Sequence, residues 1–217
     1  MVTPVVIGCA GPYSTLEAHG PAASSIAGLW WVMLAGGAVL FGLVLCAFAI
    51  AVRRPQWGRR LSPVQWIVGG GIVLPALVLP PLVVWALVAG ERLLPLPGRD
   101  VLRIEVVADQ WGWTFRYPDH GAVETVNLLH LPQGEPVDLH ITALDVIHSF
   151  WVPQLAGKLD AIPGKTNVLR LQADRTGTFQ GQCAEFCGVG HAFMRFTVEV
   201  HEPARFRALV ADAEDDT

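Results

Sequence analysis

Two long stretches of this chain carry no charged residue. They run over residues 28–52 and 65–90, 25 and 26 residues respectively. An α-helix needs about 20 apolar residues to cross the hydrocarbon core of a bilayer, and a helix satisfies its own backbone hydrogen bonds there. Two buried helices of a soluble core are the alternative, but charge-free runs of this length are typical of membrane spans. The sequence therefore predicts a transmembrane helical hairpin over residues 28–90, surrounded by lipid.

The loop between these stretches, residues 53–64, predicts the orientation of the hairpin. It holds four arginines, Arg53, Arg54, Arg59 and Arg60. Short loops rich in arginine and lysine stay on the cytoplasmic side of a membrane. Both termini, and everything after residue 90, are then expected on the outer side. The second stretch contains Gly69–Gly71 and three prolines, which are tolerated where neighbouring helices cover the backbone, so we expect a packed partner subunit.

Residues 1–27 form an outer N-terminal segment in this interpretation. Its Val6-Ile7-Gly8-Cys9 resembles a bacterial lipobox, in which the cysteine is lipidated, and the residues after it would be a polar spacer before the first span. Only eight residues precede Cys9, which is fewer than a full signal peptide has. A start further upstream would resolve this conflict. Lipidation of Cys9 and an unmodified cysteine therefore both stay open.

The charge of the chain is unevenly distributed. The net charge is −4 overall, but residues 91–217 hold eleven Lys and Arg against eighteen Asp and Glu. Nucleic acid as a partner is disfavoured, because its phosphates need a basic surface. An acidic outer region favours a basic protein partner instead.

Beyond residue 100 the hydrophobic period changes to two, as in β-strands. Turn signals rich in Pro and Gly separate the alternating segments, and several short strands at such spacing indicate a sandwich or barrel over residues 91–202. Residues 203–217 form an acidic tail, of which residues 211–217 are expected to be frayed. The alternating segments are residues 101–106, 136–141, 167–172 and 196–201.

The segment that carries chemistry reads C-x3-C-x3-H-x2-M. Its residues are Cys183, Cys187, His191 and Met194. Thiolate, imidazole and thioether are soft or borderline ligands that suit copper, and one Cys with His and Met would indicate a mononuclear blue-copper site. A second Cys allows two thiolates to bridge two metal ions. Glycines at 188 and 190 are expected to let this loop fold tightly.

One more ligand should come from another strand. His148 is the best candidate, because it follows a predicted strand and precedes a proline-containing turn. Two other interpretations of the cysteines were weighed: a disulfide in an oxidising compartment and a zinc site. Neither of them requires Met194. The remaining histidines of this region are expected at the surface: His120, His130, His140 and His201.

This segment resembles the binuclear-copper motif of cytochrome c oxidase subunit II. Further segments that resemble the family are residues 110–115, which read QWGWTF, and residues 145–164, which include KLDAIPG. The resemblance covers nearly the whole chain. It implies a two-helix transmembrane hairpin followed by a cupredoxin-like Greek-key β-sandwich on the periplasmic side of a bacterial plasma membrane.

The resemblance also implies roles for individual residues. Cys183 and Cys187 would bridge two copper ions, with His148 and His191 as terminal ligands. Met194 and the backbone carbonyl of Glu185 would be weak ligands, while the Glu185 carboxylate would reach a magnesium ion at the subunit I boundary. Trp111 would be the tryptophan through which electrons enter, whereas Trp113 is expected to be a strand aromatic.

The function implied is subunit II of a terminal oxidase, which accepts electrons from cytochrome c and passes them to haem in subunit I for reduction of oxygen to water. Partners would be subunit I, subunit III and cytochrome c. Rival hypotheses are a copper-bearing subunit of a nitric oxide reductase, a quinol oxidase subunit without copper, and a membrane-tethered binding module. Two features depart from the family pattern: Gly112 replaces a frequent aromatic residue, and residues 62–65 (SPVQ) lack a glutamate often found there. A role of this subunit in proton uptake is therefore in doubt.

Overall fold

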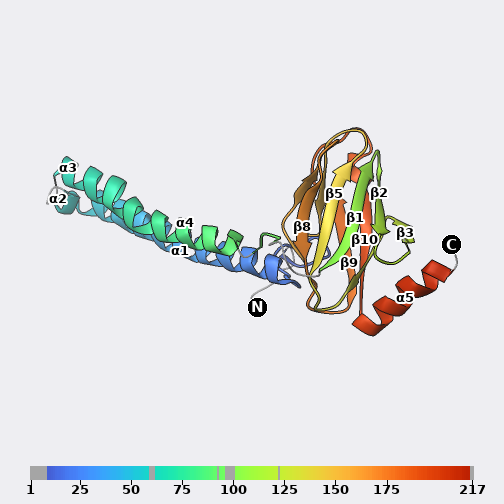
Figure 1. Cartoon of the computed structure of the whole chain (residues 1–217). Helices are drawn as coiled ribbons and strands as arrows, with labels where there is room; N and C mark the ends of the chain where they lie inside the picture. The colour runs from blue at the N-terminus through green and yellow to red at the C-terminus, as the bar shows by residue number, and fades with distance from the viewer. Residues whose placement is uncertain (1–8, 59–61, 92, 96–100, 122, 216–217) are drawn as a thin grey trace, which may run out of the picture. The chain divides into compact units, whose positions relative to one another are not determined.

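The computed structural model describes residues 9–58, 62–91, 93–95, 101–121 and 123–215 (Figure 1). The chain forms two compact units. One comprises residues 28–92 and the other comprises residues 1–27 together with residues 93–217. The lipobox positions 6–8 and the loop arginines Arg59 and Arg60 lie outside the described residues.

Most of the described residues of the unit 28–92 are helical. Two continuous helical segments, Pro21–Arg53 and Pro63–Glu91, are long and apolar enough to cross a membrane. Residues of both line one apolar pocket, from positions 32–40 of the first and positions 78–85 of the second. A helix that is apolar all round is typical of a membrane span. The helical elements are α1 (Pro21–Arg53), α2 (Pro55–Gly58), α3 (Pro63–Trp66), the π-helix η2 (Ile67–Val73) and α4 (Leu74–Glu91).

The second helical segment is irregular, as its glycines and prolines predict. The π-helix η2 contains Gly69–Gly71, and Pro80 and Pro81 lie inside α4. The segment begins with a capping box. Ser62 Oγ accepts a hydrogen bond from the Gln65 backbone N–H at 3.3 Å, and Gln65 Oε1 accepts one from the Ser62 N–H at 2.8 Å. These two polar residues therefore satisfy backbone groups that a helix start leaves unpaired.

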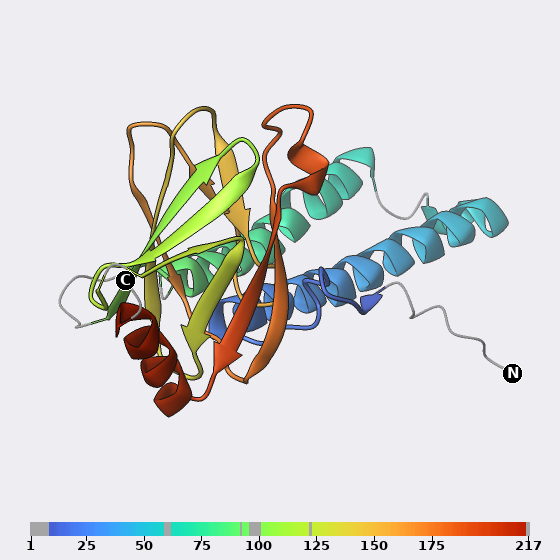
Figure 2. The same cartoon turned by 90° about the vertical axis from the view of Figure 1, so that its right-hand side faces the viewer.

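The other unit is a sandwich of two five-stranded sheets (Figures 1 and 2). The strand order is β3-β2-β1-β5-β8 in one sheet and β4-β10-β9-β6-β7 in the other. All four alternating segments of the sequence are strands, here β1, β5, β8 and β10, which confirms the predicted sandwich. The strands are β1 (Leu102–Asp109), β2 (Gly112–Tyr117), β3 (Val123–Val126), β4 (Leu128–Pro132), β5 (Val137–Ala143), β6 (His148–Trp151), β7 (Leu159–Ala161), β8 (Asn167–Leu171), β9 (Gly177–Cys183) and β10 (Arg195–His201).

An aromatic cluster fills the space between the sheets. Trp113 is fully buried, as expected of a strand aromatic, and its ring centroid lies 5.4 Å from that of Phe196. Phe150 stacks on Phe196 at 4.8 Å. Such pairs contribute about 0.5–1.5 kcal/mol each beyond their burial. Gly181 leaves room for Phe196, because a Cβ at residue 181 would lie 2.1 Å from that ring.

The acidic tail begins with a helix that packs on the sandwich unit. The helix extends to residue 215, and the expected fraying of residues 211–217 stays a prediction. Residues Pro203–Asp215 form the helix α5, and Phe206 and Val210 are buried in the core of the sandwich unit. These two residues are four positions apart and therefore share one face of a helix. The Phe206 ring lies 6.3 Å from that of Tyr117 on β2. Burial of these two side chains stabilises the packing of α5 on the sandwich, although the tail is acidic.

The N-terminal segment from residue 9 to residue 27 packs on the sandwich and is more than a polar spacer. The His19 N–H donates to the Gln154 carbonyl at 2.7 Å, and the Asp174 N–H donates to the His19 carbonyl at 2.8 Å. Ala22 and Ala23 are buried. Cys9 is an exposed free thiol. Its lipidation stays a prediction.

Candidate metal site

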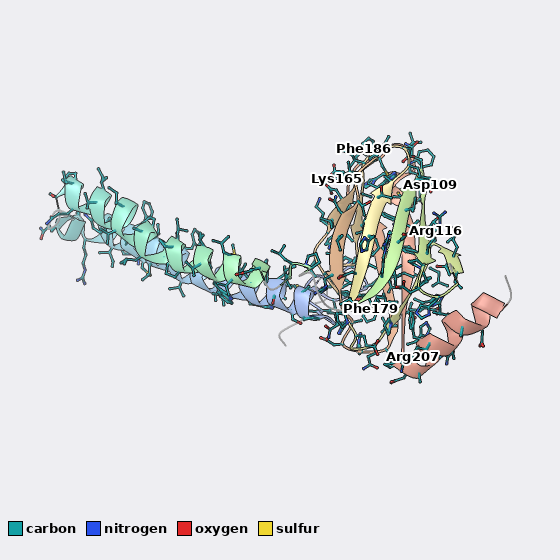
Figure 3. All side chains as sticks on the ribbon, viewed as in Figure 1. Asp109, Arg116, Lys165, Phe179, Phe186 and Arg207 are labelled. Atoms are coloured by element: carbon teal, nitrogen blue, oxygen red, sulfur yellow. The ribbon has the colours of Figure 1, made fainter. Side chains whose placement is uncertain are left out.

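The six predicted metal residues come from three strand ends and one loop. His148 begins β6, Cys183 ends β9, and Met194 immediately precedes β10. Because β9 pairs with both β6 and β10, these ends meet at one end of the sheet. The segment that carries both cysteines, residues 183–194, is called the cysteine loop. Phe186 marks it in Figure 3, at the end of the sandwich opposite Arg207 of α5.

The donor atoms of these residues converge. The two Sγ atoms of Cys183 and Cys187 are 3.8 Å apart, and Cys187 Sγ lies 3.7 Å from His191 Nδ1. Met194 Sδ lies 3.8 Å from Cys187 Sγ and 3.1 Å from His148 Nδ1. The Glu185 carbonyl lies 3.2 Å from Cys183 Sγ. The structure thus brings all six predicted metal residues together.

This donor set fits copper. The cysteines are free thiols, so the structure does not contain the disulfide considered above. His148 and Met194 are fully buried, and both cysteines are nearly so. Burial, with Cys183 beside it, raises the pKa of the Cys187 thiol to about 12. A metal ion would therefore have to displace the thiol proton at neutral pH, and a soft ion such as copper suits sulfur donors best.

Asp145 orients His148. Asp145 Oδ1 lies 2.9 Å from His148 Nε2, which leaves Nδ1 facing the sulfur atoms. The same carboxylate accepts the N–H groups of Gln110 at 2.9 Å and Val146 at 2.7 Å. Burial acts to raise the pKa of Asp145, but the hydrogen bonds from His148 and these two N–H groups lower it overall. Sequence analysis missed this role, although a carboxylate three residues before the ligand was a usable signal.

Trp111 packs against the cysteine loop. Its Nε1 donates to the Cys187 carbonyl at 3.3 Å, and Gln110 Nε2 donates to the same oxygen at 2.7 Å. A Cβ at Gly190 would lie 2.2 Å from the indole ring. Gly188 differs, because its φ of 118° favours glycine. The two glycines were expected to serve one purpose, yet Gly188 permits the turn whereas Gly190 makes room for the indole.

Several apolar side chains of the cysteine loop and of the segment before β6 are exposed. Phe186, Val189 and Phe193 of the cysteine loop are 76%, 89% and 82% exposed. We call these three, together with Leu144 and Ile147, the apolar rim. Clustered exposed apolar groups are typical of interaction sites.

Some of the acids of the sandwich are already neutralised. Glu124 pairs with Arg116 at 2.6 Å, and Asp138 accepts two hydrogen bonds from Arg170. These pairs leave the net charge of residues 91–217 unchanged, because the two arginines are already part of that count.

The two polar groups of Glu185 have different surroundings. Its carbonyl faces Cys183, whereas its carboxylate is about half exposed and lies 3.9 Å from Lys158 Nζ. Lys158 Nζ also donates to the Ala184 carbonyl at 3.3 Å. A hard ion such as Mg²⁺ prefers carboxylate oxygen, so the magnesium role of Glu185 stays a prediction.

Comparison with known proteins places these features in a family. A family model described as "Cytochrome C oxidase subunit II, periplasmic domain" matches residues 121–201. The chain is 36% identical over 164 residues to the cytochrome c oxidase subunit 2 of Alkalihalophilus pseudofirmus, covering 74% of this chain and 48% of that protein. It is 30% identical over 234 residues to the probable cytochrome c oxidase subunit 2 of Streptomyces avermitilis, covering 85% of this chain and 72% of that protein.

A solved structure supports the same assignment. The periplasmic domain of subunit II of the cytochrome oxidase of Bradyrhizobium japonicum aligns with a TM-score of 0.51 at 35% identity, covering 55% of this chain and 97% of that domain. A probable quinol oxidase subunit 2 of Staphylococcus haemolyticus is also similar, at 33% identity over 95% of this chain and 57% of that protein. The chain thus spans about half the length of several relatives. The sandwich is the cupredoxin-like domain of these relatives, the two apolar helices mark a membrane protein, and the chain belongs to the cytochrome c oxidase subunit 2 family.

Proposed function

We propose that this chain is the electron-accepting subunit of a haem–copper oxidase and that its donor is cytochrome c. One observation carries the proposal. The half-exposed indole of Trp111 donates a hydrogen bond to the carbonyl of Cys187, a residue of the buried two-cysteine cluster. Thus a surface ring is joined by one hydrogen bond to a buried sulfur site that suits copper.

The cluster would hold a pair of copper ions. Cys183 and Cys187 would be shared between them, with His148 and His191 at the two ends and Met194 and the Glu185 carbonyl as weaker partners. When bound, the pair would supply one-electron redox chemistry, taking an electron from the donor and passing it toward haem in subunit I. The chain contributes the burial, the oriented His148 ring and the close contact of Trp111 with the loop.

The donor would dock over Trp111 and the apolar rim. Long-range attraction to acidic groups raises the association rate of a basic cytochrome. Once the donor has docked, contact with the exposed ring of Phe186 and its neighbours is expected to contribute most of the affinity. This apolar part of the affinity depends only weakly on salt, whereas the association rate should fall as salt rises.

The remaining expectations belong to the same proposal. The loop after α1 would face the cytoplasm, and the sandwich and both termini would lie on the periplasmic side of the bacterial plasma membrane. Subunit I and subunit III would pack on the helices, and a magnesium ion would contact the Glu185 carboxylate at the subunit I boundary. Oxygen would be reduced in subunit I and not in this chain.

The test is reduction of the copper-loaded full chain in detergent by reduced cytochrome c, followed by stopped-flow absorbance. Trp111→Ala should slow the reduction step even at saturating cytochrome, because it removes the route between the surface and Cys187. Trp113→Phe serves as the matched control, because Trp113 is fully buried in the core. Its ring lies 6.3 Å from that of His148, so copper content is measured on the same sample.

Several outcomes would contradict the proposal. Copper that gives the four-line EPR signal of a single ion, or zinc in its place, would exclude the binuclear site. A Trp111 variant changed only in apparent affinity would make the ring a docking contact alone. Reduction by a quinol but not by any cytochrome c would favour the function named for the Staphylococcus relative.

A further inference from the structure

A second group of metal-binding side chains lies on β4 and β10, away from the cysteine loop. It consists of His130, Glu199 and His201, whose ligand atoms lie within 4.8 Å of one another. Met194 of the first site precedes β10, and His201 ends that strand. At about 3.3 Å per residue, the two groups are on the order of 20 Å apart along β10. This group is therefore a separate site.

The pairing of the two strands brings the three side chains together. β4 and β10 run parallel, with Glu199 opposite His130. Glu199 and His201 are two residues apart, so they point to the same face of β10. Val198 and Val200 point to the other face and are buried in the core. Core packing thus sets the register that aligns the three polar side chains.

The two histidines were expected at the surface, and that expectation was wrong. His130 is 7% exposed, and the His201 side chain is 10% exposed. The backbone of His130 is held on both sides by Tyr117, whose hydroxyl accepts the His130 N–H at 2.7 Å and donates to the His130 carbonyl at 3.2 Å. The backbone that carries the His130 ring is therefore held in place before any ligand arrives, which favours a preorganised site.

The electrostatic setting keeps both rings neutral near pH 7. Burial, and then the neighbouring His201, lower the pKa of His130 despite Glu199. Burial also lowers the pKa of His201, where Glu199 acts to raise it and Arg205 to lower it further. Neutral imidazole is the form that binds metal.

We propose that His130 Nδ1, His201 Nε2 and the Glu199 carboxylate bind one divalent transition-metal ion of borderline softness, with Zn²⁺ as the test ion. The two ring nitrogens are 2.9 Å apart, and Glu199 Oε2 lies 3.8 Å from each. Ligands about 2.0–2.1 Å from a tetrahedral zinc are about 3.3 Å from each other. Shifts of about half an ångström would complete the geometry and leave one position open for water.

A hydrogen bond between the two rings is the alternative. That bond needs a proton on one of the two facing nitrogens, whereas a metal ion needs both lone pairs. Glu199 favours the metal ion over the hydrogen bond. Its Oε2 lies 3.8 Å from both ring nitrogens, and its carboxylate adds the negative charge that a divalent ion requires. A bound ion would tie the edge strand β4 to the end of β10, just before α5.

The experiment measures zinc bound by the full chain in detergent. Wild type, His201→Gln and Glu199→Gln are equilibrated with Zn²⁺, and zinc per chain is measured by mass spectrometry and calorimetric titration. Wild type should bind one equivalent more than either variant. The affinity of that equivalent should fall at least tenfold in the variants, since even loss of a residue that only orients a ligand costs about 10–100-fold. His140→Gln, a histidine outside the group, should retain it.

Cobalt distinguishes this site from the cysteine loop. Co²⁺ bound to thiolate gives a sulfur-to-metal charge-transfer band, whereas Co²⁺ bound to nitrogen and oxygen does not. The equivalent lost in His201→Gln should lack that band, whether or not the cysteine loop binds copper. Equal zinc in wild type and both variants would overturn the proposal, as would binding confined to the thiolate site. Glu199 is 42% exposed, so Glu199→Gln decides the outcome should His201→Gln fail to fold.

Discussion

Replacing Gly190 by alanine tests whether the contact of Trp111 with the cysteine loop matters. A Cβ at residue 190 would lie 2.2 Å from the Trp111 ring, whereas ordinary contact begins at 3.4 Å. The ring or the loop must therefore move by about 1.2 Å. Gly190 itself has φ −87° and ψ −1°. This negative-φ conformation occurs at turns in residues other than glycine, so the substitution acts mainly through the indole.

The displacement should break the hydrogen bond from Trp111 Nε1 to the Cys187 carbonyl, which is already long at 3.3 Å. Its loss costs about 0.5–1.5 kcal/mol of stability. The functional effect should be larger, because a shift of about 1 Å in a positioned group can cost on the order of 10²-fold in rate. We expect reduction of the copper-loaded chain by cytochrome c to slow by roughly 10- to 100-fold with copper content unchanged.

The assay is stopped-flow reduction at saturating cytochrome c, with copper per chain measured on the same samples. Gly112→Ala is the matched control. It adds the same methyl group next to Trp111, but the nearest atom is 3.6 Å away, at ordinary contact distance. An unchanged rate in Gly190→Ala, or an equal loss in Gly112→Ala, would refute the assignment of the indole as the route to the cluster.

Three further predictions follow from the site and the core. Cys187→Ser should abolish binuclear copper binding, because a hydroxyl cannot replace a bridging thiolate at neutral pH. Met194→Leu should retain two copper ions and shift only the reduction potential. Copper analysis and redox titration distinguish the two variants, and a Met194→Leu chain without copper would show that Met194 is essential for binding. Phe206→Ala should destabilise the sandwich unit by about 3–5 kcal/mol, measured by denaturant unfolding, since Phe206 is buried against Tyr117; a change near zero would mean that α5 does not dock in solution. Burial lowers the pKa values of His130 and His201 below 6.5 in the folded state. Protonation therefore favours the unfolded chain, and the free energy of unfolding should decrease as pH falls below 6.5. With chelator present, His130→Gln should lose less stability over this pH range than wild type, and parallel pH profiles would contradict this.

The sequence alone determined the features that depend on local pattern. Charge-free runs longer than a bilayer span predict helices whatever the remainder of the chain does, and alternating segments such as residues 136–141 predict strands for the same reason. The cysteine loop was recognisable because four of its donors lie within twelve residues. Its chemistry is therefore encoded almost without reference to the fold.

Tertiary structure alone decided which distant residues meet. The parallel pairing of β4 and β10 brings His130 within 2.9 Å of His201, 71 positions along the chain, and nothing local marks either histidine. Trp111 reaches Cys187 across 76 positions. The docking of Phe206 and Val210 in the core likewise follows from the tertiary structure and not from the acidic composition of the tail. Contacts of this kind depend on strand register and on packing between sheets, and both are set by the whole core rather than by any one segment.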